Sequence, residues 1–351
     1  MQKNNHLPSP APSPAPGSAP SQNEHQNEHQ KRVFVAVYDP FNKLALSGTK
    51  PPPPSPEKRS LLSRAKAKDF SYNLAISLAN VPDSPLLKSY KNTIFCAWEV
   101  FKDGDKKTSR YCGNRWCLVC NRIRCAKLIK AYGPQLARLN DPYFVTLTIP
   151  NVLGHYLRPS IIDMKKNLAT ICNRYKKRHQ RQKQTWKIDG LLKIECTYNF
   201  VLNNFHPHFH AIVEGKQAAA ALVADWLKVY PACSAKGQDM RKAKAGTEKE
   251  MFKYFAKIVT PTKTGWGVYV TAMDTIFVAM KGLDTFTNMG NVRPVSEEVE
   301  GVKAEPNSEY QYGYSEYIPE VRDWVDTETG ELETGYVRSE ALEKIINNFI
   351  Q

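Results

Sequence analysis

Apolar and β-branched residues concentrate in a few short stretches in the middle of the chain, and these stretches predict strands. Residues 143–149 (YFVTLTI) are aromatic or β-branched and are followed by Pro150, which is typical of a buried strand. Residues 191–200 and 208–213 predict two further strands, joined by a loop that contains two consecutive asparagines. The pattern therefore predicts a sheet of short strands that are close together in the sequence.

Apolar residues spaced three or four apart predict helices around these strands. Ser160 is a candidate N-cap for a helix whose apolar stripe runs up to the basic residues 176–183. An alanine-rich helix is expected at 217–229, and another at 247–258, which opens with a Thr-x-x-Glu capping box. The order of elements favours an α+β fold, in which helices cover one face of a central antiparallel sheet.

The two ends of the chain differ in composition from its middle. Residues 1–31 contain almost no large apolar side chains, so we expect a disordered tail there. The N-terminal region that follows contains a proline-rich linker at 51–56. The predicted regions after the tail are an N-terminal region at 32–110, a cysteine-rich segment at 111–133, a principal domain at 140–294 and an acidic C-terminal region at 295–351.

Charge is distributed unevenly along the chain. The formal net charge is +15, but residues 295–351 hold 14 acidic and 4 basic residues, which leaves 45 basic and 20 acidic residues upstream. Such an excess favours a polyanionic partner, because neutralised phosphates release counterions; membrane surfaces and acidic proteins attract the same charge. The acidic, tyrosine-rich C-terminal region is compatible with a peripheral strand or with an interaction tail.

Several classes of protein are not supported by the sequence. The chain has no run of about 18 apolar residues and its N-terminus has no apolar signal region, so we expect a cytoplasmic protein that does not associate with a membrane. We also expect no small-molecule substrate. In a reducing compartment the eight cysteines are expected to be thiols or metal ligands rather than disulfides.

The segment HPHFH at 206–210 is the most informative in the chain. Side chains two apart in a strand share a face, so His208 and His210 point the same way about 7 Å apart, within reach of one metal. Glu195 on the preceding strand could add an oxygen ligand, and this donor set suits Mg²⁺ or Mn²⁺. His206 has the same parity and is an alternative third ligand. Ordinary hydrogen-bonded histidines and an ion-paired Glu195 are the competing interpretation.

A second constellation lies on the predicted helix at 247–258. Glu250, Tyr254 and Lys257 are four and three residues apart, which places them on one helical face. A phenol with a pKa of ~10 is a poor nucleophile at neutral pH, so an attacking tyrosine benefits from a metal and from a nearby cation such as Lys257. An ordinary charged row on an amphipathic helix has the same spacing.

The cysteine-rich segment has the spacing C-x4-C-x2-C-x4-C, formed by Cys112, Cys117, Cys120 and Cys125. Four thiolates this close together can enclose a structural Zn²⁺ ion, and the arginines among them would then face DNA phosphates. Cys125 is the least secure ligand because it would lie one turn into a helix, and Cys96 is the alternative. A cluster of reduced thiols is the competing interpretation.

Three motifs in this order, YFVTLTIPN, HPHFHAIV and EMFKYFAK, resemble those of plasmid rolling-circle replication initiators in the HUH endonuclease superfamily. The resemblance is to the branch with a single catalytic tyrosine and a glutamate four residues before it. The cysteine-rich segment extends the resemblance upstream to about residue 111. The resemblance implies an antiparallel sheet of the HUH, or ferredoxin-like, type. It also implies metal ligation by His208 and His210, nucleophilic attack by Tyr254, a motif lysine at Lys257, and activation of water or of a second attack by Glu250.

The activity implied by this resemblance is sequence-specific nicking of a plasmid origin through a 5′-phosphotyrosyl intermediate, followed by strand transfer. The expected partners are single-stranded or hairpin origin DNA, a host helicase and the replication machinery. A transposase or a mobilisation relaxase of the same superfamily is a close alternative. A non-enzymatic, zinc-containing DNA-binding regulator is the alternative from a different class.

Overall fold

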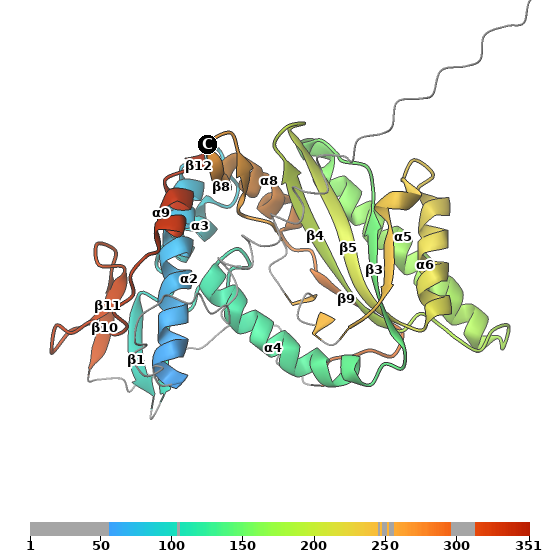
Figure 1. Ribbon diagram of the computed structural model, residues 1–351, viewed down its shortest axis with the longest axis horizontal. Helices are drawn as coiled ribbons and strands as arrows, with labels where there is room; N and C mark the ends of the chain where they lie inside the picture. The colour runs from blue at the N-terminus through green and yellow to red at the C-terminus, as the bar shows by residue number, and fades with distance from the viewer. Residues whose placement is uncertain (1–55, 104–105, 245, 248–250, 253–255, 296–312) are drawn as a thin grey trace, which may run out of the picture. The chain divides into compact units, whose positions relative to one another are not determined.

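The computed structural model describes residues 56–103, 106–244, 246–247, 251–252, 256–295 and 313–351 (Figure 1). All of these residues belong to one compact unit, Ser47–Gln351. The tail expected at 1–31, and all but the last residue of the linker expected at 51–56, lie outside the described residues.

The central sheet has five antiparallel strands. In chain order they are β3 (Pro142–Thr148), β4 (Gly190–Asn199), β5 (Asn204–Glu214), β6 (Asp239–Lys242) and β9 (Phe286–Met289). Their order in the sheet is β6-β3-β5-β4-β9, so β5 is the central strand. The three strands predicted from the apolar pattern are confirmed, although β5 begins four residues earlier than predicted.

Two helices cover one face of this sheet, α5 (Gly154–Gln180) and α6 (Lys216–Val229) (Figure 1). Phe209 of β5 points into this face, where its ring meets that of Trp226 edge-on at a centroid distance of 5.7 Å. The alanine-rich helix is confirmed, but α5 begins six residues before Ser160. Burial of Leu157 stabilises this additional N-terminal part of the helix.

A third helix, α4 (Leu118–Ala137), packs on part of the opposite face. Its buried side chains share one apolar cluster with three side chains of the sheet, Phe144, Leu191 and Ile212. Helices therefore contact both faces; the sequence predicted helices behind the sheet and the helix with Tyr254 over the metal site, but not α4 on that face. Glu195 on β4, and His208 and His210 on β5, lie an even number of residues from the cluster members of their strands. Their side chains therefore lie on the same face of the sheet, beyond α4.

A second antiparallel sheet joins the two ends of the described chain. Its strands are β1 (Glu99–Asp103), β2 (Lys106–Ser109), β10 (Tyr314–Ile318) and β11 (Asp323–Asp326), in the order β11-β10-β1-β2. Because β10 pairs with β1, part of the acidic C-terminal region is a peripheral pair of strands in a sheet with the N-terminal region. The adjacent helices are α2 (Pro56–Ala79), α3 (Leu87–Ile94) and α9 (Glu340–Ile346).

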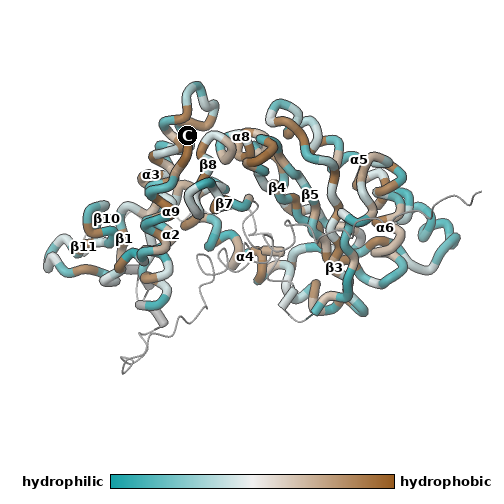
Figure 2. Tube along the Cα trace, turned by 45° about the horizontal axis from the view of Figure 1, so that its top comes forward, coloured by the Kyte–Doolittle hydropathy of each residue, from teal (hydrophilic) through white to brown (hydrophobic). Residues whose placement is uncertain are grey.

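The remaining elements are a short 3-10 helix, small strands and one buried helix. They are the 3-10 helix η1 (Ala235–Gly237), β7 (Thr260–Thr262), β8 (Gly265–Tyr269), α8 (Val270–Met280) and β12 (Phe349–Ile350). The pair β8 and β12 is parallel. Helix α8 contacts α2, α5 and β4 and is apolar along most of its length, as expected of a helix that is buried on several sides (Figure 2). In the described part of the chain no helix is long and apolar enough to cross a membrane.

The helix predicted at 247–258 does not extend to its predicted end. Thr247 is already helical and its hydroxyl accepts from the backbone N–H of Lys244, so it is not the N-cap that the predicted capping box requires. Met251 is helical too, but Ala256 forms a parallel β-bridge with Cys196, and Lys257 follows it without helical structure. The reason lies in the sheet, where the ladder between β4 and β9 ends at Lys193 and leaves the next part of the β4 edge available. The assumption of one continuous helical face through Lys257 is therefore wrong.

Candidate metal centres

Three side chains converge on the part of the sheet face that lies beyond α4. One ligand atom from each of Glu195, His208 and His210 lies within 4.8 Å of the others. The Nε2 atoms of the two histidines are each 3.7 Å from Oε2 of Glu195. Ligands about 2.1 Å from one ion lie ~3 to ~4.2 Å apart, so this arrangement fits a divalent cation. The cross-strand pairing of Glu195 with His208 brings the carboxylate beside the imidazoles.

Hydrogen bonds to the far side of each ring orient the two imidazoles. Nδ1 of His208 lies 3.1 Å from the carbonyl oxygen of His206, and since a carbonyl only accepts, Nδ1 carries the proton. Nδ1 of His210 lies 3.1 Å from Oγ1 of Thr146. Nε2 of His208 is therefore left with a lone pair directed toward Glu195, which is the form that a metal requires.

Lys193 is fully buried two residues before Glu195 on the same strand, and its Nζ lies 2.6 Å from Oε1 of that glutamate. Burial would raise the pKa of Glu195, but Lys193 together with the interactions of His208 and His210 outweighs it and holds the pKa well below its usual value. The carboxylate is therefore ionised, with Oε1 bound to Lys193 and Oε2 facing the histidines.

Burial also keeps the neighbouring histidines neutral. It lowers the pKa of His210 to about 4, with the charge of Glu195 opposing the shift. It lowers the pKa of His206 to about 4 as well. Neutral imidazole is the metal-binding form. The ring of His206 lies 5.2 Å from that of His208, but His206 is not among the ligand atoms that converge with Glu195.

Lys193 also lines a small cavity that contains two arginines. Arg115, Arg124 and Lys193 line one cavity with Phe252 and Phe286, whose rings stack at a centroid distance of 5.7 Å. Lys193 and Phe252 are buried, so this cavity lies inside the protein. Two of the arginines that the sequence expected to face DNA thus lie next to the lysine that binds the triad carboxylate.

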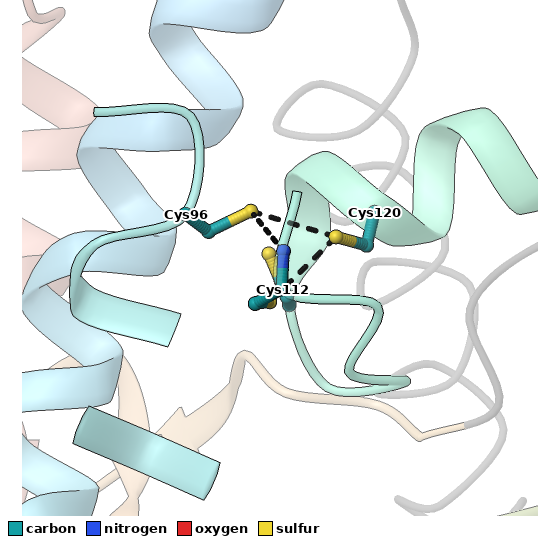
Figure 3. Close-up of side chains that lie close together, drawn as sticks. Cys96, Cys112 and Cys120 are labelled. Carbon is teal, nitrogen blue, oxygen red and sulfur yellow. Dashed lines mark hydrogen bonds between the residues drawn. The ribbon is translucent and has the colours of Figure 1, made fainter. Parts of the chain in front are cut away.

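The second group consists of four cysteines, Cys96, Cys112, Cys117 and Cys120, whose sulfur atoms all lie within 4.8 Å of one another. The sulfur of Cys120 is 3.5 Å from that of Cys96 and 3.6 Å from that of Cys112 (Figure 3). In a tetrahedral zinc site with Zn–S bonds of about 2.3 Å the sulfurs lie about 3.8 Å apart, so the cluster fits zinc. These separations are too long for a disulfide, and all four thiols are free.

Cys125 is not part of this cluster, so the prediction from the cysteine spacing that it is the fourth zinc ligand is wrong. Its thiol donates instead to the carbonyl oxygen of Phe252, at 2.5 Å. Five residues of helix separate Cys120 from Cys125, a rotation of about 140° beyond a full turn, so the two thiols point in different directions. Cys96, the alternative ligand, takes the fourth position from the loop after α3.

Of the three residues expected to perform catalysis, only Lys257 is among the described residues. Tyr254 and Glu250 lie outside the described residues. Lys257 is partly buried and directly follows Ala256, whose bridge partner Cys196 is the neighbour of Glu195. Ala256, two residues after Tyr254 in the sequence, thus pairs with the strand that carries the triad carboxylate.

Two residues of the triad's surroundings were missed from the sequence, Lys193 and Thr146. Lys193 could have been found, because it shares the strand face of Glu195 at a spacing of two. Thr146 has no such signal, because its pairing with His210 depends on the register between β3 and β5.

Comparisons with known proteins identify a related family for one part of the chain. Residues 105–218 match the family model described as a replication protein. A protein named "Protein rep" from Bacillus amyloliquefaciens is 27% identical over 135 residues, 35% of this chain and 38% of its own. The "Protein rep" of a Bacillus sp is 28% identical over 141 residues, 36% of this chain and 43% of its own. That of Staphylococcus aureus is 29% identical over 109 residues, covering 29% and 44% of the two chains.

These matches confirm the resemblance to replication proteins over the matched segment. The matched segment contains the triad and three of the four clustered cysteines, and it ends before Tyr254. Each match covers about two fifths of the relative's own length. No solved structure matches the chain.

Proposed function

We propose that this chain, whose residues 105–218 resemble replication proteins, initiates rolling-circle replication of a plasmid by nicking DNA at its origin. The observation that carries the proposal is the convergence of Glu195, His208 and His210, with the cation of Lys193 bound to the carboxylate. The excess of basic residues in the first 294 positions supports a nucleic-acid substrate.

In the proposed reaction the phenolic oxygen of Tyr254 attacks the scissile phosphorus, and the bond from phosphorus to the 3′ oxygen breaks. The products are a 5′-phosphotyrosyl bond and a strand with a free 3′-OH, which takes up a proton and can prime a polymerase. A bound Mg²⁺ or Mn²⁺ would polarise the phosphate. Attack on the phosphotyrosyl bond by a second 3′-OH then transfers the strand and releases Tyr254.

The chain's own residues have separate roles in this proposal. His208 and His210 would hold the ion through Nε2, and Glu195 through the oxygen that Lys193 leaves available. The cation of Lys257 would stabilise negative charge on the phosphate or on the phenolate. The cluster of four cysteines would hold a structural zinc ion that fixes the start of α4.

The decisive experiment is a denaturing gel of the protein with end-labelled oligonucleotides from the plasmid origin and Mg²⁺. We expect a covalent adduct on the 5′ side of the cut, which Tyr254→Phe abolishes without a loss of DNA binding. Tyr198→Phe and Tyr269→Phe are the matched controls, because each removes one phenolic oxygen from another tyrosine. Tyr198 lies on β4 and Tyr269 on β8, and their ring centroids are 5.2 Å apart. An adduct that persists in Tyr254→Phe and maps to another tyrosine would disprove the assignment.

The same assay separates this function from a DNA-binding regulator. His208→Ala should prevent nicking while leaving the protein folded, because a metal ligand is lost and the apolar cluster under α4 stays intact. Binding of origin DNA without any covalent capture in the wild-type protein supports the regulator instead. Competition between origin DNA and transposon-end or transfer-origin DNA distinguishes an initiator from a transposase or a relaxase.

A further inference from the structure

Lys68 is a buried cation beside the cysteine cluster. Its side chain is 1% exposed, and its Nζ donates a hydrogen bond of 2.7 Å to the carbonyl oxygen of Ile94. Three aromatic rings surround the ammonium group, those of Tyr72, Trp98 and Tyr317, at centroid distances of 5.6, 5.0 and 4.7 Å. We call these three residues the aromatic cage.

No carboxylate neutralises this lysine in the described part of the chain. The adjacent residue, Asp69, is fully engaged by Arg338, whose Nη2 and Nε donate to its two oxygens at 2.5 and 2.8 Å. A buried ammonium ion without a counter-charge is strongly unfavourable, and quadrupoles of aromatic rings compensate it only in part. The buried Lys68 therefore requires a negative charge that no carboxylate among the described residues supplies.

The nearest source of such an anion is the cysteine cluster. Ile94 and Trp98, which both contact Lys68, lie two residues before and two residues after Cys96. On the same helix as Lys68, the hydroxyl of Ser71 contacts the sulfur of Cys117 at 3.7 Å. Burial lowers the pKa of Lys68 to about 8, and negative charge on the nearby thiols opposes that shift.

We propose that Lys68 is the counter-cation of a metal–thiolate centre formed by Cys96, Cys112, Cys117 and Cys120. This inference rests on the proposed occupation of the cluster by a divalent metal. Four thiolates and one divalent ion carry a net charge of −2, so a buried ammonium beside them removes half of the excess charge. Each of the two groups then stabilises the other in a region from which water is excluded.

The aromatic cage extends this coupling to the C-terminal part of the chain. Tyr317 lies on β10, and its ring also contacts that of Trp324 on β11, whose Nε1 donates to the carbonyl oxygen of Ala97, next to Cys96. The strands β10 and β11 therefore cover both Lys68 and the loop that carries Cys96. Occupation of the metal centre should accordingly stabilise these strands.

The test compares zinc affinity in Lys68→Met and Lys66→Met, measured by competition with a chromophoric chelator in full-length, reduced protein. Both positions lie on α2, but Lys66 is only partly buried and has no contact with the aromatic cage. We expect Lys68→Met to weaken zinc binding by at least tenfold, in the range typical of groups that support metal ligands. Lys66→Met should bind zinc as the wild type does.

Thermal unfolding with and without zinc separates a counter-charge from a packing role. Without zinc, Lys68→Met should be as stable as the wild type or more stable, because an uncompensated buried charge is gone. With zinc it should gain less stability than the wild type gains. If the lysine had only a packing role, Lys68→Met would lower the melting temperature equally with and without zinc and would leave zinc affinity unchanged. That result would overturn the proposal.

Two further variants keep the test decisive if Lys68→Met does not fold. Lys68→Gln can still donate to Ile94 but carries no charge, and Lys68→Arg retains the charge. Affinity should fall in the glutamine variant and recover at least in part in the arginine variant, and equal affinities in both would refute the counter-charge. A wild-type chain that binds no zinc would overturn the metal centre itself, independently of nicking at Tyr254.

Discussion

Oγ1 of Thr146 lies 3.1 Å from Nδ1 of His210, on the side of the ring that faces away from Glu195. The register between β3 and β5 places these two residues directly opposite each other. The hydroxyl can therefore fix the orientation of the imidazole, as residues behind a metal ligand commonly do. Thr146 belongs to the motif YFVTLTI, so the first and second sequence motifs meet at this hydrogen bond.

We predict that Thr146→Val weakens Mn²⁺ binding at the triad about 10-fold to 100-fold. Valine has nearly the same shape as threonine but cannot form the hydrogen bond that orients the imidazole of His210. Calorimetric titration of the zinc-loaded protein with Mn²⁺ measures the effect. Thr146→Ser keeps the hydroxyl and should bind as the wild type does. Equal affinity in the valine and serine variants would show that the hydrogen bond does not support the site.

The cysteine cluster leads to a prediction that contrasts two residues. Cys96→Ala removes one of the four converging sulfurs, so the purified, reduced protein should lose most of its zinc. Cys125→Ala should retain about one zinc per chain, because its thiol is bonded to the carbonyl of Phe252 instead. Metal analysis by mass spectrometry distinguishes the two. Loss of zinc in Cys125→Ala with retention in Cys96→Ala would reverse the ligand assignment.

The sequence could predict those features of the site that depend on local geometry. The alternation of a strand is enough to place His208 and His210 on one face, and a short loop is enough to predict that β4 pairs with β5. Glu195 follows from the same hairpin, because its partner in the ladder is His208. The central sheet and the helix α6 were predictable for the same reason.

The features that the sequence could not specify depend on contacts between distant segments. Cys96 lies 16 residues before Cys112, outside any compact spacing, and joins the cluster because a loop folds back onto the start of α4. The pairing of β1 with β10 has no local signal either. The helix predicted at 247–258 ends early because Ala256 bridges Cys196, which a helical pattern cannot reveal.

The ion pair between Asp69 and Arg338 leads to a prediction of stability. Both side chains are buried, at 1% and 8% exposed, and the contact is bidentate, so Arg338→Met leaves an unpaired carboxylate inside the protein. We expect a loss of about 3–5 kcal/mol in the free energy of unfolding by urea. Arg322→Met is the control, since its pair with Glu343 is exposed and 3.9 Å long, and it should cost at most about 1 kcal/mol. Similar losses in both variants would contradict this account.

The final prediction concerns Glu250, which lies four residues before Tyr254 in the sequence. After one round of strand displacement an enzyme with a single catalytic tyrosine has to release itself from DNA. A carboxylate near Tyr254 could act as a general base toward water, which typically contributes ~10²-fold to 10⁴-fold to such a step. Initial cleavage uses Tyr254 and the metal, so Glu250→Gln should nick at nearly the wild-type rate but accumulate the covalent adduct.

The competing explanation gives Glu250 only a structural role, as the partner of Thr247 in the capping box predicted from the sequence, at a cost of about 1 kcal/mol if it is lost. Glutamine retains most of the capping ability but cannot accept the proton, so Glu250→Gln separates the two roles. Thr247→Ala is the matched control, because it removes the other member of the predicted capping box and leaves the carboxylate in place. Quantifying nicked DNA and covalent adduct over time measures initiation and release separately. If Glu250→Gln releases DNA as fast as the wild type, Glu250 is not the base and only a structural role is left.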